Sequence, residues 1–421
     1  MLYEMRNHLG VAMQRLIFVN RFFFPDHSAT SQILSDLAFH LAAGPKEVHV
    51  ITSRLLYDNP QAILPEQETI RGVRVHRLAT TRFGRKALLG RGLDYLSFYA
   101  SLRMALLDLA RAGDIIIAKT DPPLVSIPAM SAARQRGAHL VNWLQDLYPE
   151  VAQELHVPYI RGPLGNGLKL LRNTSLRRAA INVTVGEIMA AKVKAAAGAD
   201  TKVLVVPNWT DDDDIVPVPP ADNALRREWQ LEDKFVIGYS GNLGRAHEFD
   251  TVLKAAIRLR DHPQIVFVFI GGGHSFEELM RRAEELHIGT SFRFMPYQDR
   301  SQLKYSLGVP DVHLLSLQPE LEGLIVPSKF YGIAAAGKPM IAVIARDGEF
   351  APLIERHRCG LVIEPGQAQM LADAIVKLER DNAVRVSMGR SARTMLEAKF
   401  TRRGALERWR SILDRIPMAA T

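Results

Sequence analysis

Short apolar segments alternate with helical periodicities along most of this chain, and this alternation constrains its fold more than any other feature. Branched and aromatic residues form runs such as 15–20 and 265–270, while segments such as 31–41 and 250–260 repeat apolar residues every three or four positions. Strands that are apolar throughout are typical of parallel sheets covered by helices on both faces. We therefore expect an α/β protein built on doubly wound parallel sheets.

The alternation occurs in two series that are separated by a break in composition. We expect strands at 15–20, 47–51, 114–118, 140–144, 235–239, 265–270, 292–294, 312–315 and 339–343, and helices at 31–41, 95–112, 128–136, 250–260, 276–286, 370–379 and 382–416. The break follows the apolar run 203–206, where four prolines and the acidic run Asp211 to Asp214 occur within 207–223.

Two domains follow from this break. The expected organisation is a tail at 1–12, a first domain at 13–207, a linker region at 208–234, a second domain at 235–395, and a C-terminal helix at 396–421 that packs back on the first domain. A length of 421 residues is ample for two full cores.

Composition limits the cellular location and the classes of partner that we expect. No apolar run approaches the roughly 18–20 residues that a membrane-spanning helix needs, and the start of the chain lacks a secretory layout. A single cysteine, Cys359, cannot form an internal disulfide. We therefore expect a cytoplasmic protein, whose net charge of +8 leaves nucleic acid, anionic lipid and phosphorylated substrates open as partners.

Glycine-rich turns follow two of the expected strands in the second series. The first contains Gly241 and Gly244 with Arg245 and His247 close behind, and the second contains Gly272. Glycines let backbone N–H groups approach an anion, although tight turns also use glycine for steric reasons alone. If the two strands are neighbours, both turns face the same crevice and favour a phosphate-bearing ligand.

A third candidate segment spans 320–339. It combines the carboxylates Glu320 and Glu322 with the pair Ser328 and Lys329, and a run of alanine and glycine follows before the next strand. This combination is difficult to explain as ordinary surface, and it indicates a ligand-binding role.

The motifs 240–244 (SGNLG), 269–273 (FIGGG), 326–331 (VPSKFY) and 335–339 (AAGKP), in this order and spacing, resemble those of the retaining glycosyltransferases of family 4. The segment 142–150 (NWLQDLYPE) is similar to the members that build bacterial exopolysaccharides, O-antigens and capsules. The resemblance implies the GT-B fold, with two Rossmann-like domains facing a central cleft.

The same resemblance implies a reaction and a donor site. A sugar would pass, with retention of configuration, from a nucleotide diphosphate sugar of UDP or GDP type to an acceptor held by the first domain. No metal or other cofactor is expected. The donor-binding residues implied are Gly241, Asn242, Gly244, Arg245, Gly272, Pro296, Glu322, Ser328 and Lys329.

Two departures from the family pattern affect this assignment. Many relatives carry an arginine and a lysine where this chain has Asn242 and His247, so Arg245 and Lys329 are left to supply the positive charge. Two family glutamates would fall on Leu324 and Gly332, which makes the assignment of Glu322 to the donor sugar less direct.

The acceptor side is expected at the strand ends of the first domain. Asp146 follows the strand at 140–144 and could orient the acceptor or act in catalysis, while an equally simple interpretation makes it the N-cap of the next helix. His27, Ser28 and Thr30, in the loop after the first strand, are further acceptor-side candidates, although a loop histidine is often merely solvated. Asp211 to Asp214 is interpreted as a solvated charge run rather than a metal site.

Basic and apolar residues also gather in the first domain. Arg82, Arg85, Lys86 and Arg91 precede the helical pattern at 93–109, and 159–180 contains no acidic residue. We expect peripheral docking on an anionic membrane surface, where a lipid-linked acceptor would lie. A UDP-sugar 2-epimerase of the same fold and a non-enzymatic membrane-surface protein remain as alternatives, and no nucleic-acid partner is expected because no basic aromatic ribbon is visible.

Overall fold

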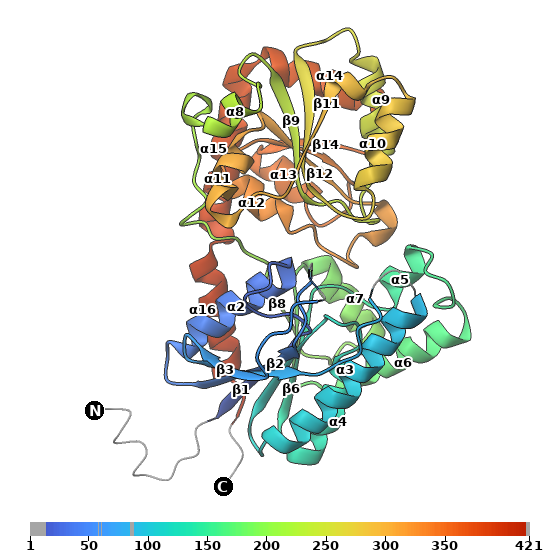
Figure 1. Ribbon diagram of the computed structural model, residues 1–421, viewed down its shortest axis with the longest axis vertical. Coiled ribbons are helices and arrows are strands. Elements are labelled where there is room, and N and C mark those ends of the chain that lie inside the picture. Colours follow the sequence, from blue (N-terminus) through green and yellow to red (C-terminus); the bar gives the residue numbers. More distant parts are fainter. Residues whose placement is uncertain (1–13, 58, 60, 85–87, 418–421) are drawn as a thin grey trace. The chain divides into compact units, whose positions relative to one another are not determined.

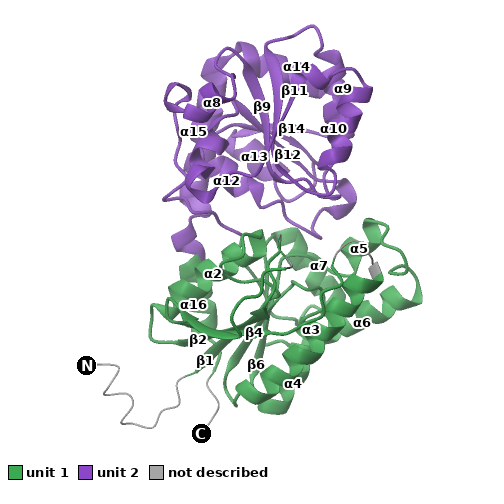
Figure 2. Cartoon of the chain, in the orientation of Figure 1, with its two compact units in different colours: residues 1–207, 406–421 green, residues 208–405 purple. Residues whose placement is uncertain are grey.

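The computed structural model describes residues 14–57, 59, 61–84 and 88–417, so the tail expected at 1–12 lies outside the described residues. The chain divides into two compact units (Figure 2). Unit 1 comprises residues 1–207 and 406–421, and unit 2 comprises residues 208–405.

The first unit contains a sheet with the strand order β3-β4-β2-β1-β5-β6-β7-β8. All neighbouring strands are parallel except β3 and β4, which form an antiparallel pair at one edge. The strands are β1 (Arg15–Val19), β2 (Glu47–Ser53), β3 (Gln67–Ile70), β4 (Val73–Leu78), β5 (Ile115–Lys119), β6 (His139–Leu144), β7 (Ile181–Thr184) and β8 (Val203–Val205).

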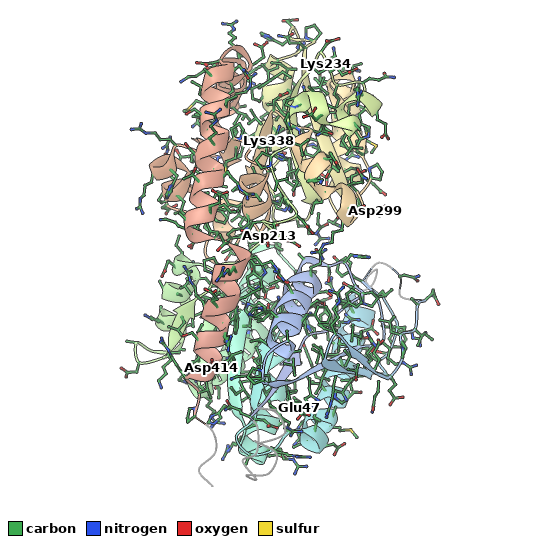
Figure 3. The ribbon with its side chains drawn as sticks, turned by 90° about the vertical axis from the view of Figure 1, so that its left-hand side faces the viewer. Glu47, Asp213, Lys234, Asp299, Lys338 and Asp414 are labelled. Atoms are coloured by element: carbon green, nitrogen blue, oxygen red, sulfur yellow. The ribbon has the colours of Figure 1, made fainter. Side chains whose placement is uncertain are left out.

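Helices cover both faces of this sheet (Figure 1). They are α2 (Ala29–Ala42), α3 (Leu88–Leu109), α4 (Ser126–Arg136), α5 (Glu150–Glu154), α6 (Pro163–Arg178), α7 (Glu187–Ala197) and α16 (Arg402–Asp414). Ile17 and Val19 share one buried cluster with residues of α3 and α4. On α16, Trp409 packs against Trp143 of β6 with ring centroids 4.5 Å apart, and Asp414, labelled in Figure 3, forms an ion pair with Lys46.

Unit 2 repeats the design with a fully parallel sheet in the order β11-β10-β9-β12-β13-β14. Its strands are β9 (Phe235–Asn242), β10 (Ile265–Gly272), β11 (Phe292–Met295), β12 (Val312–Ser316), β13 (Met340–Val343) and β14 (Gly360–Ile363). Its helices are α8 (Ala224–Glu228), α9 (Asp250–Arg258), α10 (Phe276–Glu285), α11 (Leu303–Gly308), α12 (Lys329–Ala335), α13 (Ala351–His357), α14 (Ala368–Arg380) and α15 (Asn382–Lys399).

Successive residues of the central strand β9 pack into different hydrophobic clusters, one on each face of the sheet. Phe235, Ile237 and Tyr239 pack with α9, α10 and α14, whereas Val236 packs with α8 and Val309 on the other face. The expected α/β class with two doubly wound sheets is therefore confirmed, and it follows from strands that are apolar on both faces.

Two features of the elements differ from expectation. The pattern did not indicate the β3–β4 pair, β7 or β14. The helix expected over 382–416 is interrupted, because α15 ends at Lys399 and α16 begins at Arg402. Phe400 leaves the helical path to pack on Tyr331, with ring centroids 5.4 Å apart, and the hydroxyl of Thr401 accepts a hydrogen bond from the Gly404 N–H, as an N-cap does.

Residues 208–234, for which the composition suggests a linker, belong to unit 2. Asn223 caps α8 by accepting a hydrogen bond from the Leu225 N–H, and Arg393 donates to the carbonyl of Ile215. Of the C-terminal segment 396–421, residues 396–405 belong to unit 2 and 406–421 to unit 1.

Candidate functional site

The two glycine turns of unit 2 lie against each other at the carboxyl ends of β9 and β10. Gly241 pairs with Gly271, and Asn242 with Gly272, in the parallel register. A Cβ on Gly271, whose φ is +136°, would lie 2.4 Å from the Gly241 carbonyl oxygen, and one on Gly273 would lie 2.3 Å from Oδ1 of Asn242. Only glycine allows this approach, so the two turns form one backbone surface.

Lys329, the first residue of α12, reaches this surface from another part of the chain. Its ammonium donates a hydrogen bond to the Asn242 carbonyl at 3.1 Å and lies 4.9 Å from the centre of the Tyr239 ring. A Cβ on Gly241 would come within 3.0 Å of the Lys329 Cε. Glycine at 241 therefore leaves the space that the lysine side chain occupies.

His247 holds the same ammonium from the other side. Its Nδ1 lies 2.7 Å from the Ser316 carbonyl oxygen, to which it can only donate, so Nε2 is the acceptor that faces Nζ of Lys329 at 3.4 Å. Burial and the neighbouring Lys329 lower the pKa of His247 to about 3, so the imidazole is neutral near neutral pH. Burial also lowers the pKa of Lys329 to about 8.

The other predicted donor-binding residues near these turns differ in how exposed they are. Asn242, Arg245 and Pro296 are exposed and Gly244 is half-buried; the Arg245 backbone is fixed by a hydrogen bond from Gln318 to its carbonyl. The Tyr297 ring lies on Gly271 and Gly272, because a Cβ on either glycine would meet ring carbons at 3.2–3.3 Å. The loop 243–249 separates the first turn from α9, so this turn does not lead directly into a helix.

Glu322 lies beside the loop that follows β13. Its Oε2 accepts a hydrogen bond from the Glu349 N–H at 3.3 Å, and a Cβ on Gly348 would lie 2.4 Å from the carboxyl group. Burial, together with the charges of Glu349 and Asp347, raises the pKa of Glu322 to about 7. Ser328, which immediately precedes Lys329, is the half-buried N-cap residue of α12, and its hydroxyl forms no capping bond.

In unit 1, Asp146 follows β6 at the carboxyl edge of the sheet. The N-cap interpretation is wrong, because the next helix, α5, begins at Glu150 and its N-cap residue is Pro149. Oδ1 of Asp146 is buried and accepts no hydrogen bond from any described residue. Burial and the charge of Asp121 raise the pKa of Asp146 to about 7, against the effect of a hydrogen bond from Thr120.

The loop after β1 places the acceptor-side candidates at the start of α2. His27 is exposed and its carbonyl accepts a hydrogen bond from Gln32. The hydroxyl and the N–H of Ser28 both bond to Oδ1 of Asp26, while Thr30 is half-buried in the first turn of α2. The Ser28 hydroxyl is thus used within its own loop.

The acidic run 211–214 is more structured than a solvated charge run. Asp211 pairs with Arg300 at 2.7 Å, Asp212 accepts a hydrogen bond from the Arg402 N–H, and Asp213 and Asp214 are exposed. Within the described ranges, no three His, Cys, Asp or Glu side chains are grouped so that they could hold a metal ion.

Residues outside the predicted site also gather at the carboxyl edge of unit 1. Lys119, at the end of β5, is fully buried with its ammonium 3.8 Å from the centre of the Trp143 ring, and burial lowers its pKa. Tyr95 and Tyr99 project from α3 toward the same edge, where Arg21 lies 5.2 Å from the Tyr95 ring centre. Their helical spacing was the available signal, but nothing in it indicated which side of the helix they occupy.

Two family models match the chain, one in each half. The model described as "Glycosyl transferase 4-like domain" matches residues 29–209, and the model described as "Glycosyl transferases group 1" matches residues 222–395.

Relatives of known name fit this pattern. The chain is 26% identical over 331 residues to the "Probable glycosyltransferase WbjE" of Pseudomonas aeruginosa. The aligned region covers 78% of this chain and 81% of that protein. It is 29% identical over 262 residues to the "Putative colanic acid biosynthesis glycosyl transferase WcaI" of Escherichia coli strain K12, covering 60% of this chain and 63% of that protein.

Solved structures share the fold at lower sequence identity. Sucrose-phosphate synthase from Thermosynechococcus elongatus superposes with a TM-score of 0.77 at 15% identity, covering 96% of this chain and 98% of that one. Anabaena HepE in complex with UDP and glucose gives a TM-score of 0.73 at 17% identity, covering 96% and 100%.

Proposed function

The chain belongs to the glycosyltransferases, with a 4-like domain followed by a group 1 domain, and from this premise we propose which sugar transfer it performs. It moves a sugar from a nucleotide diphosphate sugar, of UDP or GDP type, to a lipid-linked saccharide acceptor in the synthesis of a bacterial surface polysaccharide. The names of the relatives from Pseudomonas aeruginosa and Escherichia coli support this setting.

The observation that carries the proposal is the cation held over the joined glycine turns. Lys329 rests on Gly241, between the Asn242 carbonyl and His247. A diphosphate bound along these turns meets backbone N–H groups and a fixed ammonium, and the exposed Arg245 lies in the same loop. Binding of UDP by HepE supports a nucleoside diphosphate as the ligand.

This arrangement suits departure of a nucleoside diphosphate. The bond between C1 of the sugar and the β-phosphate oxygen breaks, the electron pair stays on the diphosphate, and C1 bonds to the acceptor hydroxyl oxygen. The hydroxyl proton passes to a base, for which Asp146 is the unit 1 candidate. Lys329 and Arg245 neutralise the leaving group, so we expect no metal requirement, and we expect retention at C1.

Calorimetric titration with UDP, GDP and their sugar conjugates tests the proposal. We expect at least one nucleotide to bind, and Lys329→Ala to weaken that binding about ten- to hundredfold through loss of a charge-assisted contact. Lys254→Ala, which removes an exposed lysine from the same unit, is the matched control. Binding of no nucleotide by the wild-type protein would overturn the proposal.

Product analysis after incubation with the nucleotide sugar alone separates transfer from the epimerase alternative. An epimerase would interconvert a UDP-sugar without any acceptor, whereas a transferase requires one. Both matched family models describe transferases, which favours transfer.

We propose further that α3 and the 159–178 region bring the enzyme to an anionic membrane surface. Leu89, Leu93, Leu96 and Met104 of α3 are 85%, 50%, 63% and 65% exposed, and Tyr159, Leu164 and Leu170 are 84%, 54% and 64% exposed. Arg82, Arg161, Arg177 and Arg178 are exposed near them in sequence; Arg85 and Lys86 lie outside the described residues. None of the described helices is long and apolar enough to cross a bilayer.

Cosedimentation with liposomes tests the membrane contact. We expect binding that requires phosphatidylglycerol, weakens with salt, and falls severalfold in a Leu93→Gln, Leu96→Gln double variant. Met280→Gln, which changes an apolar residue of unit 2 that is 39% exposed, is the control. Equal sedimentation with neutral and anionic liposomes would contradict docking on an anionic surface.

A further inference from the structure

The two central strands of the unit 2 sheet, β9 and β12, separate toward their carboxyl ends. They pair with each other at 237–238 and 312–313, although β9 continues to Asn242 and β12 to Ser316. Over these last residues β9 stays paired with β10, and β12 stays paired with β13. The strand order changes direction at this point, and doubly wound sheets bind their ligands at such a point.

The loop 245–248 bonds to β12 and the residues after it, where β9 has separated from that strand. The Gln318 N–H donates a hydrogen bond to the Ala246 carbonyl at 2.9 Å, and the Glu248 N–H donates to the Ser316 hydroxyl at 2.8 Å. The same hydroxyl donates to the Glu248 carbonyl at 2.6 Å. The backbone of this loop therefore takes the place of β9 as the partner of the segment 316–318.

Two further hydrogen bonds fix the residues of the loop that face the donor site. The side-chain amide of Gln318 donates from Nε2 to the Arg245 carbonyl at 3.0 Å, and Nδ1 of His247 donates to the Ser316 carbonyl at 2.7 Å. No described residue forms a hydrogen bond or an ion pair with the Arg245 guanidinium. The backbone of Arg245 is thus held in place while its charged group remains available to a ligand.

Gln318 is itself held firmly. Its N–H bonds to the Ala246 carbonyl, and its own carbonyl accepts a hydrogen bond from the Leu321 N–H at 3.0 Å. Leu321 is buried and ends the short 3₁₀ helix η4 (Pro319–Leu321). Because both backbone groups of Gln318 are bonded, its side-chain amide reaches Arg245 from a fixed frame, as the support of a binding residue requires.

We propose that Gln318 is a positioning residue of the donor site. By holding the Arg245 carbonyl, its amide keeps the loop 245–248 in the conformation in which the Arg245 guanidinium meets the diphosphate, and Gln318 does not contact the nucleotide itself. A loop that is already ordered loses less conformational entropy when the ligand binds, so this hydrogen bond raises nucleotide affinity. The inference rests on the proposed function, in which Arg245 neutralises the diphosphate.

Calorimetric titration of Gln318→Met with UDP or GDP, whichever binds the wild type, tests the effect on affinity. Methionine keeps the length of the side chain and removes the amide. We expect affinity to fall about three- to tenfold, the effect of one lost hydrogen bond. Gln264→Met is the matched control, because Gln264 is also half-buried and precedes β10 at the opposite edge of the sheet; its affinity should stay within about twofold of the wild type.

A double-mutant cycle with Arg245→Ala tests whether Gln318 acts through Arg245. If it does, Gln318→Met should change nucleotide affinity by less than about twofold once the guanidinium is absent. The phosphorus-31 NMR signal of the bound β-phosphate adds a readout that a purely structural glutamine would not move. In Gln318→Met this signal should shift from its wild-type position in the same direction as in Arg245→Ala, whereas Gln264→Met should leave it in place.

The outcomes separate this inference from the proposed function. Wild-type affinity in Gln318→Met, an equal loss with and without the Arg245 side chain, or an unmoved β-phosphate signal in Gln318→Met would each overturn the positioning role while leaving nucleotide binding itself established. Binding of no nucleotide by the wild-type protein would instead overturn the proposed function, and the positioning role with it.

Discussion

At the scale of single residues, the polar groups that matter most are those whose ordinary charge the fold alters. His247 is kept neutral by burial and by the ammonium beside it, and this neutrality lets its Nε2 accept a hydrogen bond from Lys329. The sequence identified both residues as candidates, but their contact joins positions 82 residues apart. No local pattern can indicate such a pairing, because it depends on β9 and β12 being neighbours in the sheet.

Replacing His247 tests whether it positions Lys329. We expect His247→Met to weaken UDP or GDP binding about three- to tenfold, since it removes one long hydrogen bond to a charged group. His247→Gln offers a donor for the Ser316 carbonyl and an acceptor for the ammonium, and should bind within about twofold of the wild type. Titration calorimetry from pH 6 to 9 provides the measurement.

The pH dependence of nucleotide affinity distinguishes a histidine that acts on Lys329 from one with a purely structural role. The pKa of Lys329 is about 8, so nucleotide affinity should decline as the pH rises past that value and the ammonium is lost. Without the imidazole acceptor the ammonium is less favoured, and the decline should begin at lower pH in His247→Met. The same profile in both proteins would show that His247 does not act on Lys329.

Asp146 supports a second residue-scale prediction, on the pH dependence of transfer. Its folded-state pKa of about 7 is raised from an ordinary value near 3.8, so the reactive carboxylate accumulates only as the pH rises through 7. We expect kcat/KM to rise between about pH 6 and 8 and then to level off. Asp146→Asn should lower it about a hundredfold and abolish the rise.

A rise in kcat/KM caused by Asp146 must be distinguished from one caused by Glu322, because the pKa of Glu322 is also raised to about 7. Glu322→Gln should keep the rise that Asp146 causes. The stability of the protein should behave oppositely to its activity: a carboxyl whose pKa is raised by folding stabilises the protein below its unfolded pKa, and this contribution is lost as the pH rises through 7. Asp146→Asn should therefore unfold at a higher temperature than the wild type at pH 8. A rise in kcat/KM that persists in Asp146→Asn and disappears in Glu322→Gln would reverse the assignment.

At the scale of elements, a strand or a helix boundary could be predicted from the sequence when a local residue pattern determined it, and was missed when it depended on distant contacts or on a very short segment. The strands β9 and β10 and their glycine turns were predictable because an apolar run followed by glycine is a local signal. β14 was missed because the strand Gly360–Ile363 is only four residues long and directly follows the end of a polar stretch, 355–358, so its apolar run is too short to stand out. The break between α15 and α16 was missed because it depends on Phe400 packing against Tyr331.

The contact between the turns of β9 and β10 makes a strong prediction about Gly271. Gly271→Ala would place a Cβ 2.4 Å from the Gly241 carbonyl oxygen in a backbone conformation with φ of +136°. We expect it to lower the free energy of unfolding by roughly 2–5 kcal/mol and to abolish nucleotide binding.

Gly366→Ala is the matched control for Gly271→Ala. Its φ of +90° is also unfavourable for alanine, but no atom lies within 4 Å of the added Cβ. It should lower the free energy of unfolding by only about 1–2 kcal/mol and leave nucleotide binding unchanged. Denaturant unfolding and calorimetry on both variants provide the measurements, and similar losses in the two would show that the contact between the turns is unimportant.

At the scale of the whole molecule, the positive charge that the composition left unassigned now has two distinct locations. Lys329 and Arg245 belong to unit 2, at its glycine turns, and the exposed arginines near α3 and α6 belong to unit 1. Because each unit has its own sheet and its own buried clusters, a ligand that binds one unit should protect that unit's segments. Hydrogen exchange measured by mass spectrometry can locate this protection.

We expect UDP or GDP, whichever binds, to slow exchange at 241–247, 271–273 and 326–331. At a hundredfold excess over Kd, a ligand specific to the folded state stabilises it by about 2.7 kcal/mol. Nucleotide protection should be the same in EDTA and in magnesium, because the diphosphate charge is met by Lys329, Arg245 and backbone N–H groups. Nucleotide protection that appears only with magnesium would show that a metal ion neutralises part of the diphosphate charge, and nucleotide protection confined to unit 1 would contradict the proposed donor site in unit 2.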